Sequence, residues 1–192
     1  MNGKAFIMRG RLDANIIVFD FDGTIVNLET NWDHLREELR SFSHERLGLD
    51  ETFRPLDRGL ERLKRIDISA FEYAIDIVVH YEIDGYKGRI NKDVVYFIKE
   101  DLSPQQKLAI FSGNSRKSIE TVLAQLGIYP DFIVGREDIL ENPKPSGKGL
   151  LKIVSHFNAE VNEAVFIGDS NLDLDAGSSV GIKTVLWRSI WI

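Results

Sequence analysis

The sequence of 192 residues contains no cysteine. Disulfide bonds and thiolate metal sites are therefore excluded, and the absence suits a reducing compartment. An excess of basic residues is also missing, because the formal net charge is −6 at pH 7. This balance argues against a nucleic-acid-binding protein, which normally carries a basic face, and against a general attraction to anionic membranes.

Long apolar runs are absent as well. No segment approaches the roughly 18 to 20 apolar residues of a membrane-spanning helix, and residues 1–15 contain no apolar stretch long enough for a signal peptide. We therefore expect a soluble, cytoplasmic protein with no membrane partner. Because 43% of the residues are apolar, the chain can still build a real core, and its length suits one domain or a core with a modest insertion.

The sequence does contain an alternation of strand and helix patterns. Residues 16–20 read IIVFD, a run of β-branched and aromatic side chains that is typical of a strand buried on both faces. Further strand patterns at 107–112, 132–134, 164–168 and 182–187 are separated by helical patterns. Strands that alternate with helices predict a parallel sheet, and therefore an α/β, Rossmann-like core.

One long segment interrupts this alternation. Residues 30–92 have apolar side chains at three- and four-residue spacing, which predicts helices, with Thr30 and Ser69 as candidate N-caps. We predict that residues 29–91 form an inserted all-helical lobe, and that residues 1–28 and 92–192 form the α/β core. The alternative is that these helices cover one face of the sheet within a single domain.

Two acidic pairs lie at the predicted strand ends. Asp20 and Asp22 follow the first strand, and Asp169 and Asp173 follow the strand at 164–168. In open parallel sheets, functional sites form at the carboxyl ends of the strands. Carboxylates gathered there repel one another unless a cation lies between them, and Mg²⁺ prefers oxygen ligands. The pattern therefore predicts a magnesium site.

A hydroxyl residue and a lysine complement these acids. Ser112 ends another strand, and Gly113 and Asn114 lead into a helix whose first N–H groups favour a phosphate. Lys144 lies in the loop ENPKPSG, where its ammonium could neutralise a transferring phosphoryl group. Lys148 is the rival lysine, but it lies within the next helical pattern, so we expect it to be solvated.

Together these residues resemble the four motifs of haloacid dehalogenase (HAD) superfamily phosphatases, in the same order. The motifs read DFDGT at 20–24, FSG at 111–113, NPKP at 142–145 and GDSNLD at 168–173. The inserted helices resemble the cap of phosphoglycolate-phosphatase-like members. The resemblance covers nearly the whole chain and implies a HAD-like fold.

The resemblance also implies a role for each motif residue. Asp20 would attack phosphorus and form an aspartyl-phosphate, and Asp22 would act as general acid and then as general base. Mg²⁺ would be held by Asp20, the backbone carbonyl of Asp22 and Asp169, with support from Asp173 through water. The residues implied in phosphate binding are Gly23, Thr24, Ser112, Gly113, Asn114 and Lys144. The expected activity is hydrolysis of a small-molecule phosphate monoester.

Several alternatives stay open. A phosphomutase shares all four motifs, although its first motif usually has a bulkier apolar residue at the position of Thr24. A phospho-receiver signalling module or a non-catalytic phospho-ligand-binding protein also uses clustered acids.

Single residues also have alternative roles. Asp173 could instead be a helix N-terminal acid. The basic run from Arg54 to Arg65 could select an acidic substrate, but a solvated face is the favoured interpretation. The substrate and the oligomeric state are not readable from these residues.

Overall fold

The computed structural model describes residues 14–187, so parts of the predicted core at 1–13 and 188–192 lie outside the described residues. A five-stranded parallel sheet forms the centre, in the order β5-β4-β1-β6-β7. Its strands are β1 Ile16–Phe19, β4 Lys107–Phe111, β5 Phe132–Val134, β6 Ala164–Gly168 and β7 Lys183–Leu186. The predicted α/β fold with a parallel sheet is therefore confirmed.

The central strand β1 determines where the site lies. All four of its residues are buried, with Ile17 and Phe19 in one apolar cluster and Ile16 and Val18 in the other. Phe19 lies in register with Ile110 of β4 and Ile167 of β6. Because these strands are parallel, the residues that follow each of them emerge at the same edge of the sheet.

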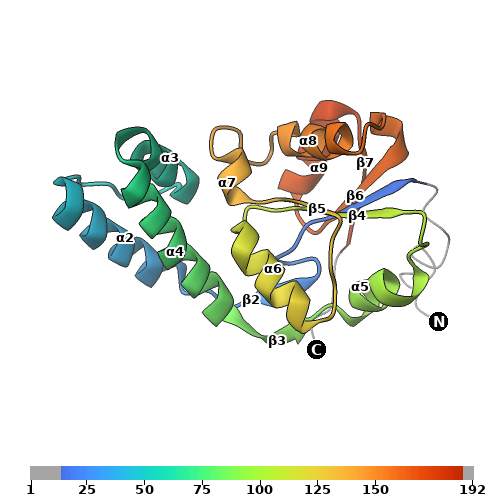
Figure 1. The fold of residues 1–192 in the computed structure, drawn as a ribbon, viewed down its shortest axis with the longest axis horizontal. Coiled ribbons are helices and arrows are strands. Elements are labelled where there is room, and N and C mark those ends of the chain that lie inside the picture. Colours follow the sequence, from blue (N-terminus) through green and yellow to red (C-terminus); the bar gives the residue numbers. More distant parts are fainter. Residues whose placement is uncertain (1–13, 188–192) are drawn as a thin grey trace.

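Helices cover both faces of this sheet (Figure 1). On one face lie α5 Lys92–Tyr96, the π-helix η1 Phe97–Asp101 and α6 Arg116–Gln125; on the other lie α7 Arg136–Ile139, α8 Lys148–His156 and α9 Asn171–Val180. A 3₁₀-helix, η2 Val161–Glu163, precedes β6. Between residues 14 and 187, no helix is both long and apolar enough to cross a membrane.

The remaining helices form a lobe beside the sheet (Figure 1). They are α2 Trp32–Leu47, α3 Leu56–Ile66 and α4 Ile68–Gly85, and the apolar side chains that predicted helices here form a cluster of their own. The predicted N-caps are wrong by one or two residues. Asn31 and Asp67 cap α2 and α4, because their side chains accept the N–H groups of His34 and Ala70.

Two short antiparallel strands connect this lobe to the sheet. They are β2 Val26–Leu28 and β3 Tyr86–Ile90. Residues 86–90 thus form a strand inside the range 29–91 that was predicted to be all helical. The register of the two strands shifts between Val26 and Leu28, and there Gly88 of β3 adopts a positive φ of 78°, which favours glycine. The chain therefore enters and leaves the lobe along one two-stranded ribbon.

Candidate active site

Three carboxylates meet at the carboxyl edge of the sheet. Asp20 follows β1, and its N–H donates to the carbonyl of Ile167, which extends the pairing with β6 by one residue. Asp169 follows β6, and Asp173 lies in the first turn of α9. One oxygen from each of these three carboxylates lies within 4.8 Å of the others. The structure thus brings together three of the four acids predicted at the metal site.

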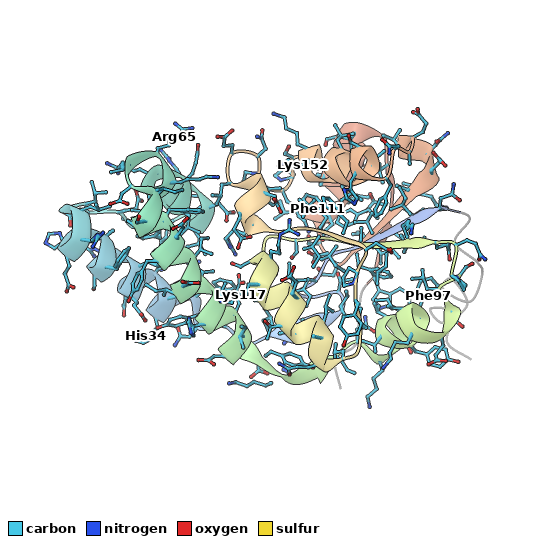
Figure 2. The ribbon with its side chains drawn as sticks, in the orientation of Figure 1. His34, Arg65, Phe97, Phe111, Lys117 and Lys152 are labelled. Carbon is cyan, nitrogen blue, oxygen red and sulfur yellow. The ribbon has the colours of Figure 1, made fainter. Side chains whose placement is uncertain are left out.

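Lys144 lies between two of these acids. Its Nζ donates to Oδ1 of Asp20 at 2.8 Å and to Oδ1 of Asp173 at 2.6 Å. The ammonium also lies 4.8 Å from the ring centre of Phe111, labelled in Figure 2, and 5.2 Å from that of Phe166. Burial alone would lower the pKa of Lys144, but the two carboxylates outweigh it and raise that pKa above its usual value. Lys144 is therefore a cation held against the carboxylates.

The pKa values of Asp20 and Asp173, the two carboxylates that Lys144 contacts, shift in opposite directions. Burial raises the pKa of Asp20 above its ordinary value, although the Lys144 ammonium opposes that rise. Burial also acts on Asp173, but Lys144 and hydrogen bonds from Ser170 outweigh it and hold the pKa of Asp173 below its usual value. Ser170 and Asp173 form a capping box at the start of α9. Asp173 is thus a helix N-terminal acid and also a member of the carboxylate cluster.

Asp22 is not one of the three clustered carboxylates, although its charge interacts with those of Asp20 and Asp169. Its Oδ1 accepts the N–H of Leu28 at 2.8 Å, across the turn that leads into β2. Burial is the main cause that raises the pKa of Asp22 to about 6, and the charges of Asp20, Asp169 and Glu82 add to the rise. A carboxyl group with this pKa can hold a proton near neutral pH. Coordination of a metal by the Asp22 backbone carbonyl stays a prediction.

The turn after β1 is held closely against Asp169. Gly23 has a φ of 89°, and its N–H donates to the carbonyl of Val26. The buried Thr24 directs its Oγ1 toward Oδ1 of Asp169 at 3.5 Å, and Asn91 donates to the Thr24 carbonyl at 3.0 Å. The predicted phosphate contacts of Gly23 and Thr24 stay predictions, because in this arrangement both residues are engaged with the protein itself.

The substitution Gly23→Ala tests this close packing. A Cβ at position 23 would lie 2.5 Å from Oδ2 of Asp169, so the carboxylate would have to move. We expect turnover to fall at least about 10-fold and stability to fall by about 1–3 kcal/mol. Gly48→Ala is the matched control, because Gly48 also has a positive φ but would place its Cβ in open space. Equal activity in the two variants, measured beside their unfolding transitions, would contradict this packing role.

Ser112 and Asn114 lie at the same edge of the sheet, in the loop that follows β4. Both are buried, and the Ser112 hydroxyl donates to Oδ1 of Asn114 at 3.0 Å. Gly113 lies half-buried between them, just before α6. Because β4 is the parallel neighbour of β1, this loop emerges beside Asp20. The loop therefore lies at the same edge of the sheet as Asp20, and its predicted phosphate contacts stay predictions. Lys148 is exposed at the start of α8, as expected.

The basic run lies on the outer face of the lobe. Arg65, labelled in Figure 2, points outward and pairs with Glu61, while Arg54 pairs with Asp33 and Arg62 with Glu51. The three arginine side chains are 56–72% exposed. Such pairs contribute little to stability. The interpretation as a solvated face with acidic partners fits this arrangement.

A buried ion pair was missed by the sequence analysis. Glu82 of α4 is 0% exposed, and Arg136 at the start of α7 is 6% exposed. Their side chains meet at 3.2 Å, between the lobe and the sheet. A signal for Glu82 does exist, because this acid follows Phe71, Ile75 and Val78 on the apolar stripe of its helix. No comparable local signal marks Arg136.

Comparison with known proteins agrees with this geometry. Pyrophosphatase PpaX of Bacillus cereus (strain Q1) is 25% identical over 179 residues, which is 90% of this chain and 82% of that protein. A predicted phosphoglycolate phosphatase from Haemophilus somnus 129pt has a TM-score of 0.58 at 19% identity, covering 92% of this chain and 86% of that one. A mutant of CbbY from Rhodobacter sphaeroides, in complex with xylulose-(1,5)bisphosphate, has a TM-score of 0.61 at 18% identity, covering 92% and 87%.

The family assignment follows from a further match. The profile of the haloacid dehalogenase-like hydrolases matches residues 17–187, which span all four motifs and the helical lobe. This chain belongs to the haloacid dehalogenase-like hydrolase family and, with phosphatase and pyrophosphatase relatives, is an enzyme of that hydrolase family.

Proposed function

We propose that this protein is a magnesium-dependent phosphatase that hydrolyses a small-molecule phosphate monoester through an aspartyl-phosphate on Asp20. The observation that carries the proposal is the different environment of two neighbouring acids. Asp20 contacts the Lys144 ammonium at 2.8 Å, whereas Asp22 accepts the N–H of Leu28 and has a pKa that burial raises to about 6. A carboxyl group oriented by a cation suits a nucleophile, and a neighbouring one that can hold a proton near neutral pH suits a general acid.

The chemistry of the first step follows from these two groups. An oxygen of Asp20 attacks phosphorus, the new bond forms there, and the bond from phosphorus to the ester oxygen breaks. The carboxyl group of Asp22 gives its proton to the departing oxygen, so that an alcohol leaves rather than an alkoxide. Lys144 orients Asp20 and offers its charge to the phosphoryl oxygens, and Ser112 binds a phosphoryl oxygen from the neighbouring strand end.

The second step reverses the role of Asp22. Its carboxylate takes a proton from a water molecule, which attacks the aspartyl-phosphate and releases inorganic phosphate. Asp20 is regenerated as a carboxylate beside Lys144. The water must reach this edge only after the alcohol has left, which favours a cover over the site. We assign that cover to the inserted segment 29–91, acting as a cap.

The donor set fits a magnesium ion. Three carboxylates share this edge, with oxygens within 4.8 Å of one another, while Lys144 supplies a single positive charge among them. Asp20, Asp169 and the backbone carbonyl of Asp22 would hold the ion, with Asp173 in support. When bound, Mg²⁺ would neutralise part of the charge on the phosphoryl group.

The relatives support a phosphorylated small molecule as substrate. One is named a pyrophosphatase, one a predicted phosphoglycolate phosphatase, and one is described in complex with a sugar bisphosphate. The molecules in these names and descriptions share a phosphoryl group. The phosphoryl-transfer residues at the sheet edge therefore suit the whole group, and the choice of substrate is assigned to the lobe.

Release of phosphate from p-nitrophenyl phosphate tests the proposed function. With excess Mg²⁺ we expect turnover, and with EDTA we expect turnover to fall at least about 100-fold, because the charge of the phosphoryl group would be left without its main counter-ion. Restoring Mg²⁺ beyond the EDTA concentration should restore the rate. Turnover that is unchanged in EDTA would contradict the magnesium assignment. A panel of small phosphate esters, scored by the ratio kcat/KM, would then identify the substrate class.

A further inference from the structure

The buried pair Glu82–Arg136 joins the lobe to the sheet, and its one link to the proposed chemistry so far is the small contribution of the Glu82 charge to the raised pKa of Asp22. Glu82 lies near the end of α4 in the lobe, and Arg136 follows β5 on the sheet side (Figure 1). Nη2 of Arg136 donates to Oε1 of Glu82 at 3.2 Å, and Nη1 of Arg136 pairs with Asp57 of α3. Both acids that partner Arg136 thus belong to the lobe.

Glu82 also binds the first turn of α6. Its Oε2 accepts the backbone N–H of Ser115 at 2.8 Å and the hydroxyl of Ser118. Ser115 is the N-cap residue of α6, but its own side chain makes no capping bond. An unpaired N–H group at a helix start needs an acceptor, and a carboxylate is favoured there by the helix dipole. Glu82 therefore caps α6 from a different element of the fold.

This helix start directly continues the predicted phosphate loop. Ser115 follows the loop at 112–114, and its N–H donates to Glu82. Arg136 binds the loop as well, because its backbone N–H donates to the carbonyl of Asn114 at 2.8 Å. The two charged residues thus hold the two sides of one peptide group, between Asn114 and Ser115: Glu82 of the lobe accepts its N–H, and Arg136 of the sheet side donates to its carbonyl.

The polar character of this contact allows it to form and to break. Glu82 is completely buried, so its charge depends on partners that all lie on the sheet side. Separation of the lobe would expose these groups to water, which can solvate each of them. A buried charge without a partner is unfavourable, so a partly docked lobe is disfavoured relative to a docked or an open one. The pair therefore favours two discrete positions of the lobe.

We propose that Glu82 is a positioning residue that couples docking of the lobe to the shape of the phosphate loop at 112–114. When the lobe is docked, Glu82 caps α6 and pairs with Arg136, and the loop is held for the phosphoryl group. When the lobe is open, the loop loses this support. The inference rests on the proposed function, because it concerns the same phosphate site.

The substitution Glu82→Gln tests the proposal, because it keeps the side-chain shape and removes the charge. We expect the affinity for inorganic phosphate, measured by calorimetry with Mg²⁺ present, to fall at least about 10-fold. We expect KM for p-nitrophenyl phosphate to rise by a similar factor, with a smaller change in kcat, since a binding loop contacts the phosphoryl group before and during reaction. Hydrogen exchange at the Ser115 amide should accelerate at least about 10-fold, because a neutral amide oxygen is a weaker acceptor than a carboxylate.

Glu72→Gln is the matched control, because Glu72 lies on the same helix but is exposed. If Glu82→Gln does not fold, the triple variant Glu82→Gln, Arg136→Met and Asp57→Asn removes all three charges of the cluster and should fold, since neutral groups replace both ion pairs. The same losses are expected in it. A folded variant with wild-type phosphate affinity and wild-type exchange at Ser115 would overturn the proposal.

The outcomes also separate this inference from the proposed function. Phosphate affinity and amide exchange need no turnover. Wild-type protein that binds phosphate but hydrolyses no ester would overturn the proposed phosphatase alone. Unchanged phosphate binding in Glu82→Gln would overturn the positioning role alone. Wild-type protein that neither binds phosphate nor hydrolyses esters would overturn both.

Discussion

Asp20→Asn is expected to abolish phosphate release, with kcat lower by about 10⁴-fold or more. The amide has nearly the same shape as the carboxylate, so packing at the end of β1 should survive. It carries no negative charge, however, and cannot form the acyl-phosphate bond that the proposed mechanism requires. The measurement is release of phosphate from p-nitrophenyl phosphate, together with a search for phosphate covalently attached to the protein after rapid acid quenching.

Asp175→Asn provides the control for this experiment. Asp175 lies on α9, as Asp173 does, but it is exposed. The control variant should keep full activity and should become phosphorylated as the wild type does. Full activity in Asp20→Asn would show that a different group attacks phosphorus. A covalent phosphate that persists in Asp20→Asn would lead to the same conclusion.

Lys144→Met is expected to lower both activity and stability. Methionine can keep the contacts with the rings of Phe111 and Phe166, but it removes the only described cation that contacts the carboxylates of Asp20 and Asp173 among residues 14–187. Turnover should fall on the order of 10²–10³-fold, because one charge-stabilising donor is lost. Stability in EDTA should fall by about 3 kcal/mol, because two largely buried carboxylates lose their partner.

Urea unfolding in EDTA measures the stability change without a competing cation. Lys148→Met is the matched control, because Lys148 lies four residues later and is exposed. We expect it to change the free energy of unfolding by less than about 0.5 kcal/mol and to leave turnover intact. If Lys144→Met were as stable and as active as this control, the central place of Lys144 in the site would be wrong.

Much of the candidate site was predictable because its residues follow strands that can be identified from short local sequence patterns. The run at 16–20 and the strand at 164–168 are short, apolar and β-branched or aromatic, and each is followed by acids. Parallel strands end at one edge of a sheet, so Asp20 and Asp169 had to come close once the sheet was recognised. The three helices of the lobe were predictable for a similar reason, since the periodic spacing of apolar residues is also a local property.

Other features could not be predicted from neighbouring residues. The N-caps are Asn31 and Asp67 rather than the predicted Thr30 and Ser69. Several residues near a helix start can act as a cap, so the sequence leaves the position uncertain by one or two residues. The strand β3 formed within a segment that was expected to be helical, because its partner β2 lies about sixty residues earlier in the chain.

The sequence by itself determined the five strands of the parallel sheet, the acids at the strand ends and the family to which the chain belongs. Only the tertiary structure decided which charges neutralise one another. Lys144 meets Asp20 across 124 residues of sequence, and Arg136 meets Glu82 across 54. The stability of a buried charge depends on the partner and on the water that folding leaves around it, and neither is a property of the local chain.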